Sequence, residues 1–284
     1  MKRSWIPVGE LQLLPVSGGQ LWIDGGSMFG MVPRMMWQRF AEPDSQHRVL
    51  VETNCFVVRT PTSLGLIDSG YGGKAGPKVR QRMSMEDGMP LVRNLAEHGI
   101  VPDQIDWVIL SHLHFDHVGG CVARNASGRL EPVFRRARHI IQQTEWADAT
   151  GEIPELVGSY FADDIVPLAD AGLVEQVDGT TEIVPGVTVT LTGGHTRGHQ
   201  SIALQSGEAS AIFAGDICPT AAHLPTIWTL SYDQFPLTVR RLKASLFDNV
   251  IQHDRLLLFS HDPVTPAVRL TRSADGQVVA HPVS

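Results

Sequence analysis

The first 70 residues carry short apolar runs separated by turn residues. Runs of about four to eight apolar or β-branched residues between Gly, Pro or Ser are typical of strands. Several strands before any clear helical pattern indicate an antiparallel or mixed sheet. We expect the segments 11–14 and 20–24 to be two strands around the turn Ser17-Gly18-Gly19, and further strands at 49–51, 55–59 and 64–67.

The rest of the chain alternates between helical and strand-like patterns. Helices are expected at 77–86, between Pro90 and Gly99, from about residue 144, and at 237–247. Pro at the first turn and Gly after the last are the usual start and stop signals of a helix. Strands are expected at 105–110, 139–142, 173–177, 181–184, 187–191, 201–204, 211–213 and 255–259, and a hairpin around Asp275-Gly276.

The segment 25–48 is rich in Met and aromatic residues but is interrupted by Gly and Pro, which makes it a poor regular element. Because Met adapts to irregular ligands, one interpretation is an apolar wall, a lid or a dimer contact over a pocket. The other interpretation is a loop buried on the core.

Composition narrows the classes of function. The net charge is −7, and the densest basic run, Arg135, Arg136 and Arg138, offers no phosphate footprint, so we expect no nucleic-acid partner. No apolar run reaches the length of a membrane-spanning helix, so no membrane partner is expected. The three cysteines are odd in number and far apart, which favours reduced thiols and a cytoplasmic location: Cys55, Cys121 and Cys218.

The densest group of candidate metal-binding side chains lies directly after the apolar run 107–110. His112, His114, Asp116 and His117 place three imidazoles and a carboxylate within six positions. Neutral imidazole and carboxylate are ligands of divalent zinc, iron, cobalt and manganese. If the segment is a loop that follows a strand, His112 and His114 can face the same metal ion. Asp116 and His117 then reach toward a second ion. A histidine-rich surface loop is the alternative, and the density of the cluster argues against it.

Three later residues follow the same design, in which an apolar strand is followed by Gly or Ser and then by a donor: His195, Asp216 and His261. With the cluster they supply five histidines and two aspartates, enough donors for two metal ions. Loops at one edge of a strand scaffold are where such a site can be assembled.

These residues resemble the motifs of the metallo-β-lactamase-fold hydrolases over about residues 49–262: Asp68, His112-x-His114-x-Asp116-His117, His195, Asp216 and His261. The resemblance implies one domain over 1–284 of class α/β (α+β), a four-layer αββα sandwich of two mixed sheets flanked by helices. It also implies one metal ion at His112, His114 and His195, and a second at Asp116, His117 and His261. Asp216 would bridge the two ions, and Asp68 would support a histidine of the cluster from behind. His199 lies outside the ligand set, and its alternatives are a supporting role, a pocket role and core packing.

A narrower similarity is to the N-acyl-homoserine lactonase branch. It is carried by the segment 24–33 with Trp37 and by the segment 215–220 with His223. The residues expected near the substrate are Met28, Phe29, Met31, Trp37, His223 and Tyr232. In this branch a Tyr lies three positions after the bridging Asp and contacts the substrate carbonyl, but Pro219 occupies that position here. The branch also implies a homodimer.

The implied activity is that of a dinuclear metallohydrolase. A metal-bridging hydroxide would open a lactone or cleave a carboxylic ester, with Asp116 and Asp216 as catalytic residues and zinc, cobalt, manganese or iron as the metal. Phosphotriester or aryl ester cleavage at the same site is the main rival, and a metal-binding regulatory protein is the rival from another class. The Gly-x-Ser-x-Gly elbow of serine hydrolases is absent from the sequence. Di-iron redox chemistry is disfavoured because His114 stands where the oxygen-reducing branch carries Glu.

Overall fold

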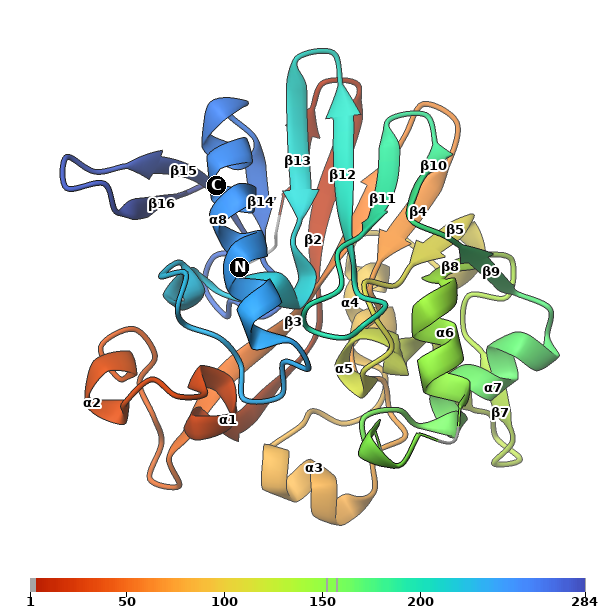
Figure 1. The fold of residues 1–284 in the computed structure, drawn as a ribbon. Coiled ribbons are helices and arrows are strands. Elements are labelled where there is room, and N and C mark those ends of the chain that lie inside the picture. The colour runs from red at the N-terminus through yellow and green to blue at the C-terminus, as the bar shows by residue number, and fades with distance from the viewer. Residues whose placement is uncertain (1–3, 152, 157, 284) are drawn as a thin grey trace.

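Two seven-stranded sheets form the centre of the structure, a computed structural model that describes residues 4–151, 153–156 and 158–283 (Figure 1). Side chains of both sheets share one apolar cluster, which includes Leu13 and Phe56 of the first sheet and Val189 and Phe213 of the second. The sheets therefore pack face to face, and their inner faces are the core of the molecule.

The first sheet joins antiparallel strands to parallel ones. Strands β1 to β4 pair antiparallel, and β4, β5, β8 and β9 pair parallel. In spatial order the sheet consists of β1 (Ile6–Val8), β2 (Leu11–Asp24), β3 (Arg48–Arg59), β4 (Leu64–Ile67), β5 (Trp107–Ile109), β8 (Arg138–Gln142) and β9 (Val174–Val177).

The second sheet is formed by the last third of the chain. Its pairs are antiparallel except for β13 and β14, which run parallel. Its order is β10 (Thr180–Val184), β11 (Val187–Leu191), β12 (Gln200–Ser206), β13 (Ala209–Phe213), β14 (Leu256–Leu258), β15 (Ala267–Arg272) and β16 (Val278–Pro282). A separate small hairpin is made by β6 (Val122–Arg124) and β7 (Leu130–Pro132).

Helices cover the two outer faces. The outer face of the first sheet packs on α4 (Pro90–Glu97) and α7 (Ala162–Asp170) through Leu91, Leu95, Ile165 and Leu168. The outer face of the second sheet packs on α8 (Pro236–Gln252) through Phe247 and Val250. The remaining α-helices are α1 (Gly25–Phe29), α2 (Arg34–Trp37), α3 (Pro77–Met83), α5 (Phe115–Val118) and α6 (Gln143–Thr150). These layers confirm the expected sandwich of two mixed sheets between helices.

Two local expectations are corrected. Residues 11–24 form one strand of 14 residues instead of two strands around a turn. The register against β3 shifts between Ser17 and Gln20, so Gly18 and Gly19 are accommodated as a bulge. The segment 25–48 is not irregular throughout, because it contains α1 and α2.

Candidate metal centre

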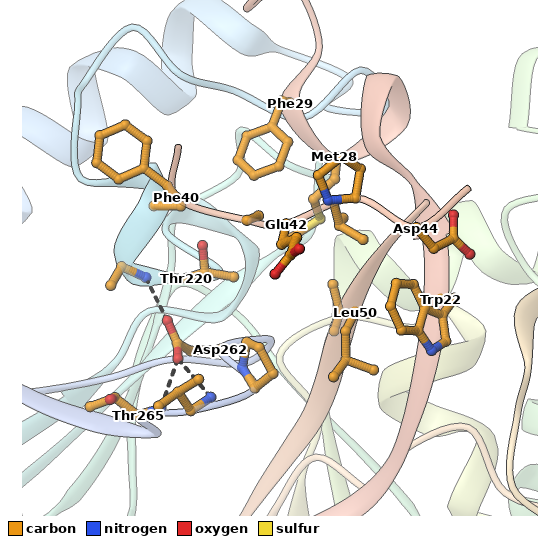
Figure 2. Close-up of a pocket in the computed structure, with 18 residues that line it drawn as sticks. Trp22, Met28, Phe29, Phe40, Glu42, Asp44, Leu50, Thr220, Asp262 and Thr265 are labelled. Carbon is orange, nitrogen blue, oxygen red and sulfur yellow. Dashed lines mark hydrogen bonds between the residues drawn. The ribbon is translucent and has the colours of Figure 1, made fainter. Parts of the chain in front are cut away.

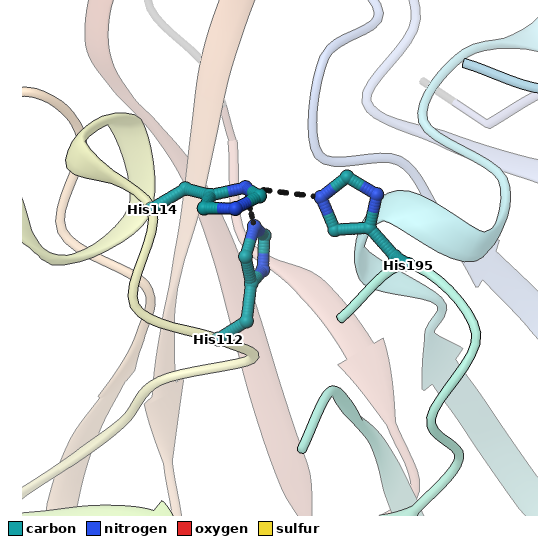
Figure 3. A group of neighbouring side chains, drawn as sticks. All are labelled: His112, His114 and His195. Carbon is teal, nitrogen blue, oxygen red and sulfur yellow. Dashed lines mark hydrogen bonds between the residues drawn. The ribbon is translucent and has the colours of Figure 1, made fainter. Parts of the chain in front are cut away.

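Strand ends bring the predicted ligands to one edge of the two sheets. His112 follows β5, Asp216 follows β13 and His261 follows β14. His112, His114 and His195 meet there: the distance from His114 Nδ1 to His112 Nε2 is 3.0 Å, and to His195 Nε2 it is 3.1 Å. In Figure 3 the three rings turn their nitrogens toward one point. Three imidazoles from two separate loops thus face one another.

A second group of donors adjoins the first. His117 Nε2 lies 3.2 Å from His261 Nε2, and the Asp116 carboxylate lies 3.9 Å from His117 and 3.7 Å from His261. In each of three groups, the donor atoms lie within 4.8 Å of one another: His112, His114 and His195; His112, His117 and Asp216; and Asp116, His117 and His261.

Asp216 lies between the two groups. Its Oδ1 is 3.5 Å from His117 Nε2 and 3.2 Å from His261 Nε2, and its Oδ2 is 3.4 Å from His195 Nε2. Burial alone would raise the pKa of this carboxyl, but the surrounding histidines outweigh burial and hold it well below its usual range. Asp216 is therefore ionised, with one oxygen toward each group.

The hydrogen bonds behind the histidines decide which ring nitrogens face inward as acceptors. His261 Nδ1 donates to the Glu52 carbonyl oxygen at 2.9 Å, and His117 Nδ1 donates to Asp68 at 2.8 Å. Their Nε2 lone pairs then face each other across 3.2 Å, an arrangement that two neutral imidazoles cannot satisfy by themselves. A cation between them removes the repulsion, so the donor set fits a metal ion.

The electrostatics of the cluster agree with this fit. Burial and the neighbouring histidines hold the pKa values of His112 and His114 well below the usual range, which keeps both lone pairs free. Burial by itself would lower the pKa of His117, but the negative charges of Asp216 and Asp68 outweigh this effect and raise the pKa. The carboxylates therefore favour positive charge at this place, which a divalent ion would supply.

Asp68 and His199 lie behind the donors. Asp68 accepts hydrogen bonds from the Ser111 amide at 2.7 Å and the Ser111 hydroxyl at 2.8 Å, besides its contact with His117. His199 Nε2 accepts from the Asp216 amide at 3.2 Å. Gly215, with φ of +52°, leaves room for that ring, because a Cβ there would lie 2.4 Å from His199 Nε2. Both residues thus fix the loops that carry the donors.

Two further positioning residues were not expected from the sequence. Asp233 accepts from His195 Nδ1 at 2.7 Å and from the Leu230 amide at 2.9 Å. Glu145 accepts from the Leu113 amide at 2.8 Å and the Thr196 hydroxyl at 2.7 Å, and so joins the two histidine loops. Glu145 lies at the start of the helix that is expected from about residue 144, and no local sequence pattern marks Asp233.

The residues expected near the substrate separate into three groups. Phe29, Trp37 and His223 are buried, and Phe29 stacks on the other two rings at 5.1 and 4.9 Å. His223 bonds Thr220 through Nδ1 at 2.8 Å and donates from Nε2 to the Met28 carbonyl at 2.9 Å. Both ring nitrogens of His223 are therefore engaged within the protein, and a substrate contact of His223 or Trp37 stays a prediction.

Met31 is 73% exposed and lies beside Arg240. Tyr232, in contrast, lies at the donors: its ring meets that of His195 edge to face at 5.8 Å. Its hydroxyl donates to Met28 Sδ at 3.6 Å, a weak acceptor. Among the residues expected near the substrate, Tyr232 is thus the one placed beside the proposed ligands, with the buried Met28 next to it.

Comparison with known proteins finds relatives named as a lactonase and as a probable metallo-hydrolase. Over 170 residues the chain is 28% identical to the N-acyl homoserine lactonase AiiA of Bacillus thuringiensis subsp. kurstaki, a match that covers 56% of this chain and 60% of that protein. A probable metallo-hydrolase of Mycobacterium tuberculosis is 26% identical over 181 residues, which is 60% of this chain and 56% of the relative. The chain thus spans less than two thirds of the length of these relatives.

Solved structures share the fold over nearly the whole chain. A probable metal-dependent hydrolase from Staphylococcus aureus superposes with a TM-score of 0.90 at 27% identity, covering 98% of this chain and 99% of the other. The dizinc quorum-quenching lactonase AidC superposes with a TM-score of 0.80 at 20% identity, covering 99% and 97%.

Within the described residues, every helix is too short or too polar to cross a bilayer. Residues 48–261 match the sequence model of the Metallo-beta-lactamase superfamily. That range holds all seven predicted ligands, and the chain belongs to the metallo-beta-lactamase superfamily.

Proposed function

We propose that the protein is a hydrolase that uses two divalent metal ions to open lactone rings or to cleave carboxylic esters. The observation that carries this proposal is the position of Asp216, whose two oxygens face two different histidine groups at 3.2 to 3.5 Å. A carboxylate shared by two groups of donors suits a pair of ions and has no evident purpose in a site for one.

In this proposal one ion would be held by His112, His114 and His195, the other by Asp116, His117 and His261, and both by Asp216. When bound, such ions supply a water whose pKa is lowered to roughly 7, and so a nucleophile at neutral pH. Zinc suits the nitrogen and oxygen donors, and cobalt, manganese or iron would be accepted by the same set.

The two carboxylates differ in their surroundings. The side chain of Asp116 is 15% exposed and that of Asp216 is 3% exposed. Asp216 also accepts from the Ser260 hydroxyl at 2.9 Å. Asp116 is therefore the carboxylate that can take a proton from the attacking water and pass it to the leaving oxygen. Asp216 is the more enclosed of the two and would hold the ions in place.

Tyr232 is the proposed donor to the substrate carbonyl. Pro219 has no side-chain donor, whereas the Tyr232 hydroxyl has a thioether as its partner and is free to exchange it for a carbonyl oxygen. Burial and the Asp216 charge raise the pKa of Tyr232 well above its usual value, so the hydroxyl keeps its proton. A protonated phenol can stabilise negative charge that develops on the carbonyl oxygen.

The lactone comes first among the substrates because several of the similar proteins are N-acyl homoserine lactonases. Esters follow because the same attack on a carbonyl cleaves them. Attack of the same water on phosphorus instead of on a carbonyl carbon would cleave a phosphotriester. Phosphotriester cleavage is therefore the rival activity. The homodimer stays a prediction.

The test is metal analysis followed by a substrate panel. Protein reconstituted separately with zinc, cobalt and manganese is assayed with acyl-homoserine lactones, phenyl acetate and paraoxon. We expect about two ions per chain and turnover of a lactone, and Asp216→Ala should lower both. Fewer than one ion per chain after metal supplementation would favour a binding protein. Strong turnover of paraoxon without any lactone would favour a phosphotriesterase.

A further inference from the structure

A cavity of about 700 Å³ lies next to the candidate metal centre but contains none of the proposed ligands. Trp22 of β2 and Leu50 of β3 form one wall, and the turn after α2, with Phe40 and Glu42, lies opposite (Figure 2). The base is formed by the chain around Thr220 and by residues 262–265, directly after Asp216 and His261. Its volume falls within the range of small-molecule sites.

The back of the cavity is preformed. Met28 and Phe29 line it and are buried, and Phe29 is held between the rings of Trp37 and His223. Phe40 meets the edge of Trp228 at 5.3 Å, although 63% of Phe40 is exposed. A ligand would therefore meet an apolar, largely aromatic surface that needs little rearrangement.

The charged side chains that line the cavity are all acidic: Glu42, Asp44 and Asp262. Asp44 is paired with Arg48, whose Nε donates to it at 2.8 Å. Asp262 accepts from the backbone amides of Ala221, Val264 and Thr265 at 2.7 to 3.0 Å. Both carboxylates therefore already have partners within the protein.

Glu42 differs from these two. Glu42 is an exposed residue at the solvent side of the cavity. Within the described parts of the chain, no hydrogen bond or ion pair engages its carboxylate, which points toward the cavity in Figure 2. The guanidinium of Arg48 lies over the Trp22 ring at 5.8 Å and is engaged by Asp44 and by the Arg82 carbonyl oxygen. The cavity thus combines apolar walls with one unpaired negative charge.

We propose that this cavity is a second binding site, for a monocation with an apolar body such as an alkyl- or arylammonium ion. The ammonium group would pair with Glu42 and lie near the face of Phe40, which attracts cations, whereas the Trp22 ring already carries the Arg48 guanidinium. The apolar body would cover Leu50 and Val51. A carboxylate of the same shape would be repelled by the unpaired charge of Glu42 and would bind more weakly. The site is independent of the proposed hydrolase activity.

The test uses three probes with the same chain and different head groups: n-octylammonium, 1-octanol and octanoate. Calorimetric titration of the purified protein should show that octylammonium binds about tenfold more tightly than octanol, a difference of roughly 1.4 kcal/mol, and that octanoate binds more weakly still. Equal affinity for the three probes would overturn the proposal, because the cavity would then be merely apolar.

Two variants locate the binding. Glu42→Gln should bring octylammonium to the affinity of octanol, whereas Glu208→Gln, an exposed glutamate in the β12–β13 turn, controls for the net charge and should change nothing. Leu50→Trp fills the cavity and should abolish binding of all three probes. Unchanged binding in Leu50→Trp, or equal losses in both glutamate variants, would contradict the proposed site. So would sedimentation data in which the probes bind only after a dimer dissociates, since a second copy would then occupy this face.

Discussion

Three histidines of the metal centre are each held by a different acceptor behind the ring. His117 bonds the Asp68 carboxylate, His195 bonds Asp233, and His261 bonds the Glu52 carbonyl oxygen. Each bond fixes a tautomer and a ring direction, and a carboxylate partner also makes the other nitrogen a stronger donor to a metal. At the scale of single residues, the acceptors behind the rings are therefore as important as the rings themselves.

Asp233→Asn should weaken the site at His195. One carboxylate now serves both His195 Nδ1 and the Leu230 amide, and an asparagine has a single carbonyl oxygen for two donors. Loss of such a partner lowers metal affinity about 10- to 100-fold. Chelator competition measures the affinity, and the exposed Asp178→Asn is the matched control. Unchanged affinity in Asp233→Asn would show that Asp233 only shapes its loop.

His139→Leu should make the protein more resistant to acid. Burial lowers the pKa of His139 from 6.5 to about 4, so the unfolded chain takes up a proton in this range before the folded chain does. Stability therefore falls as the pH drops from 6.5 toward 4, by about 2 kcal/mol between pH 7.5 and 5.

Urea unfolding at pH 7.5 and pH 5 measures this loss, which should shrink by that amount in His139→Leu. The exposed His253→Gln should keep the full loss. If both variants lose stability in parallel with the parent protein, other groups dominate the acid response.

At the scale of elements, the sequence predicts the strand ends better than the connections. The donors after β5, β13 and β14 were identifiable because each apolar strand is followed by a small residue and then a ligand. The continuity of β2 could not be predicted from the sequence, because Gly18-Gly19 is typical of a turn. Only pairing with β3 makes these residues a bulge. Helix α7 could not be predicted from the sequence because Pro167, a residue that usually interrupts helices, lies in its interior. Asp233 belongs to a loop whose contacts depend wholly on the tertiary structure.

Lys243→Met should loosen the loop 224–235. From α8, the buried Lys243 donates to the carbonyl oxygens of Pro225 at 3.0 Å and Trp228 at 2.6 Å, and a methionine would leave both oxygens without this donor. Since the same loop carries Asp233, its displacement would also disturb His195. We expect faster hydrogen exchange at 224–235 and lower kcat, with exchange in β11 to β13 unchanged.

The exposed Lys78→Met on α3 is the control and should behave like the parent protein. Unaltered exchange in the loop of Lys243→Met would mean that apolar packing around Trp228, and not the lysine, holds it.

At the scale of the whole molecule, the candidate metal centre joins two halves of the chain. The sheet of residues 6–177 supplies His112, His114, Asp116 and His117, and the sheet of residues 180–282 supplies His195, Asp216 and His261. Neither half holds a complete donor set. Ions bound there would connect the sheets at an edge where carboxylates and imidazoles otherwise crowd one another.

Metal removal should therefore lower the thermal stability of the whole fold. A ligand at 100 times its Kd stabilises the folded state by about 2.7 kcal/mol, which corresponds to a Tm increase of roughly 5 °C for a chain of this size. Calorimetric scans of EDTA-treated protein, before and after addition of zinc, cobalt or manganese, measure the change. Asp216→Ala should lose most of the increase because Asp216 faces both groups. An equal increase in this variant would place the stabilising ion elsewhere, and no increase with any of the three metals would argue against a metal centre between the halves.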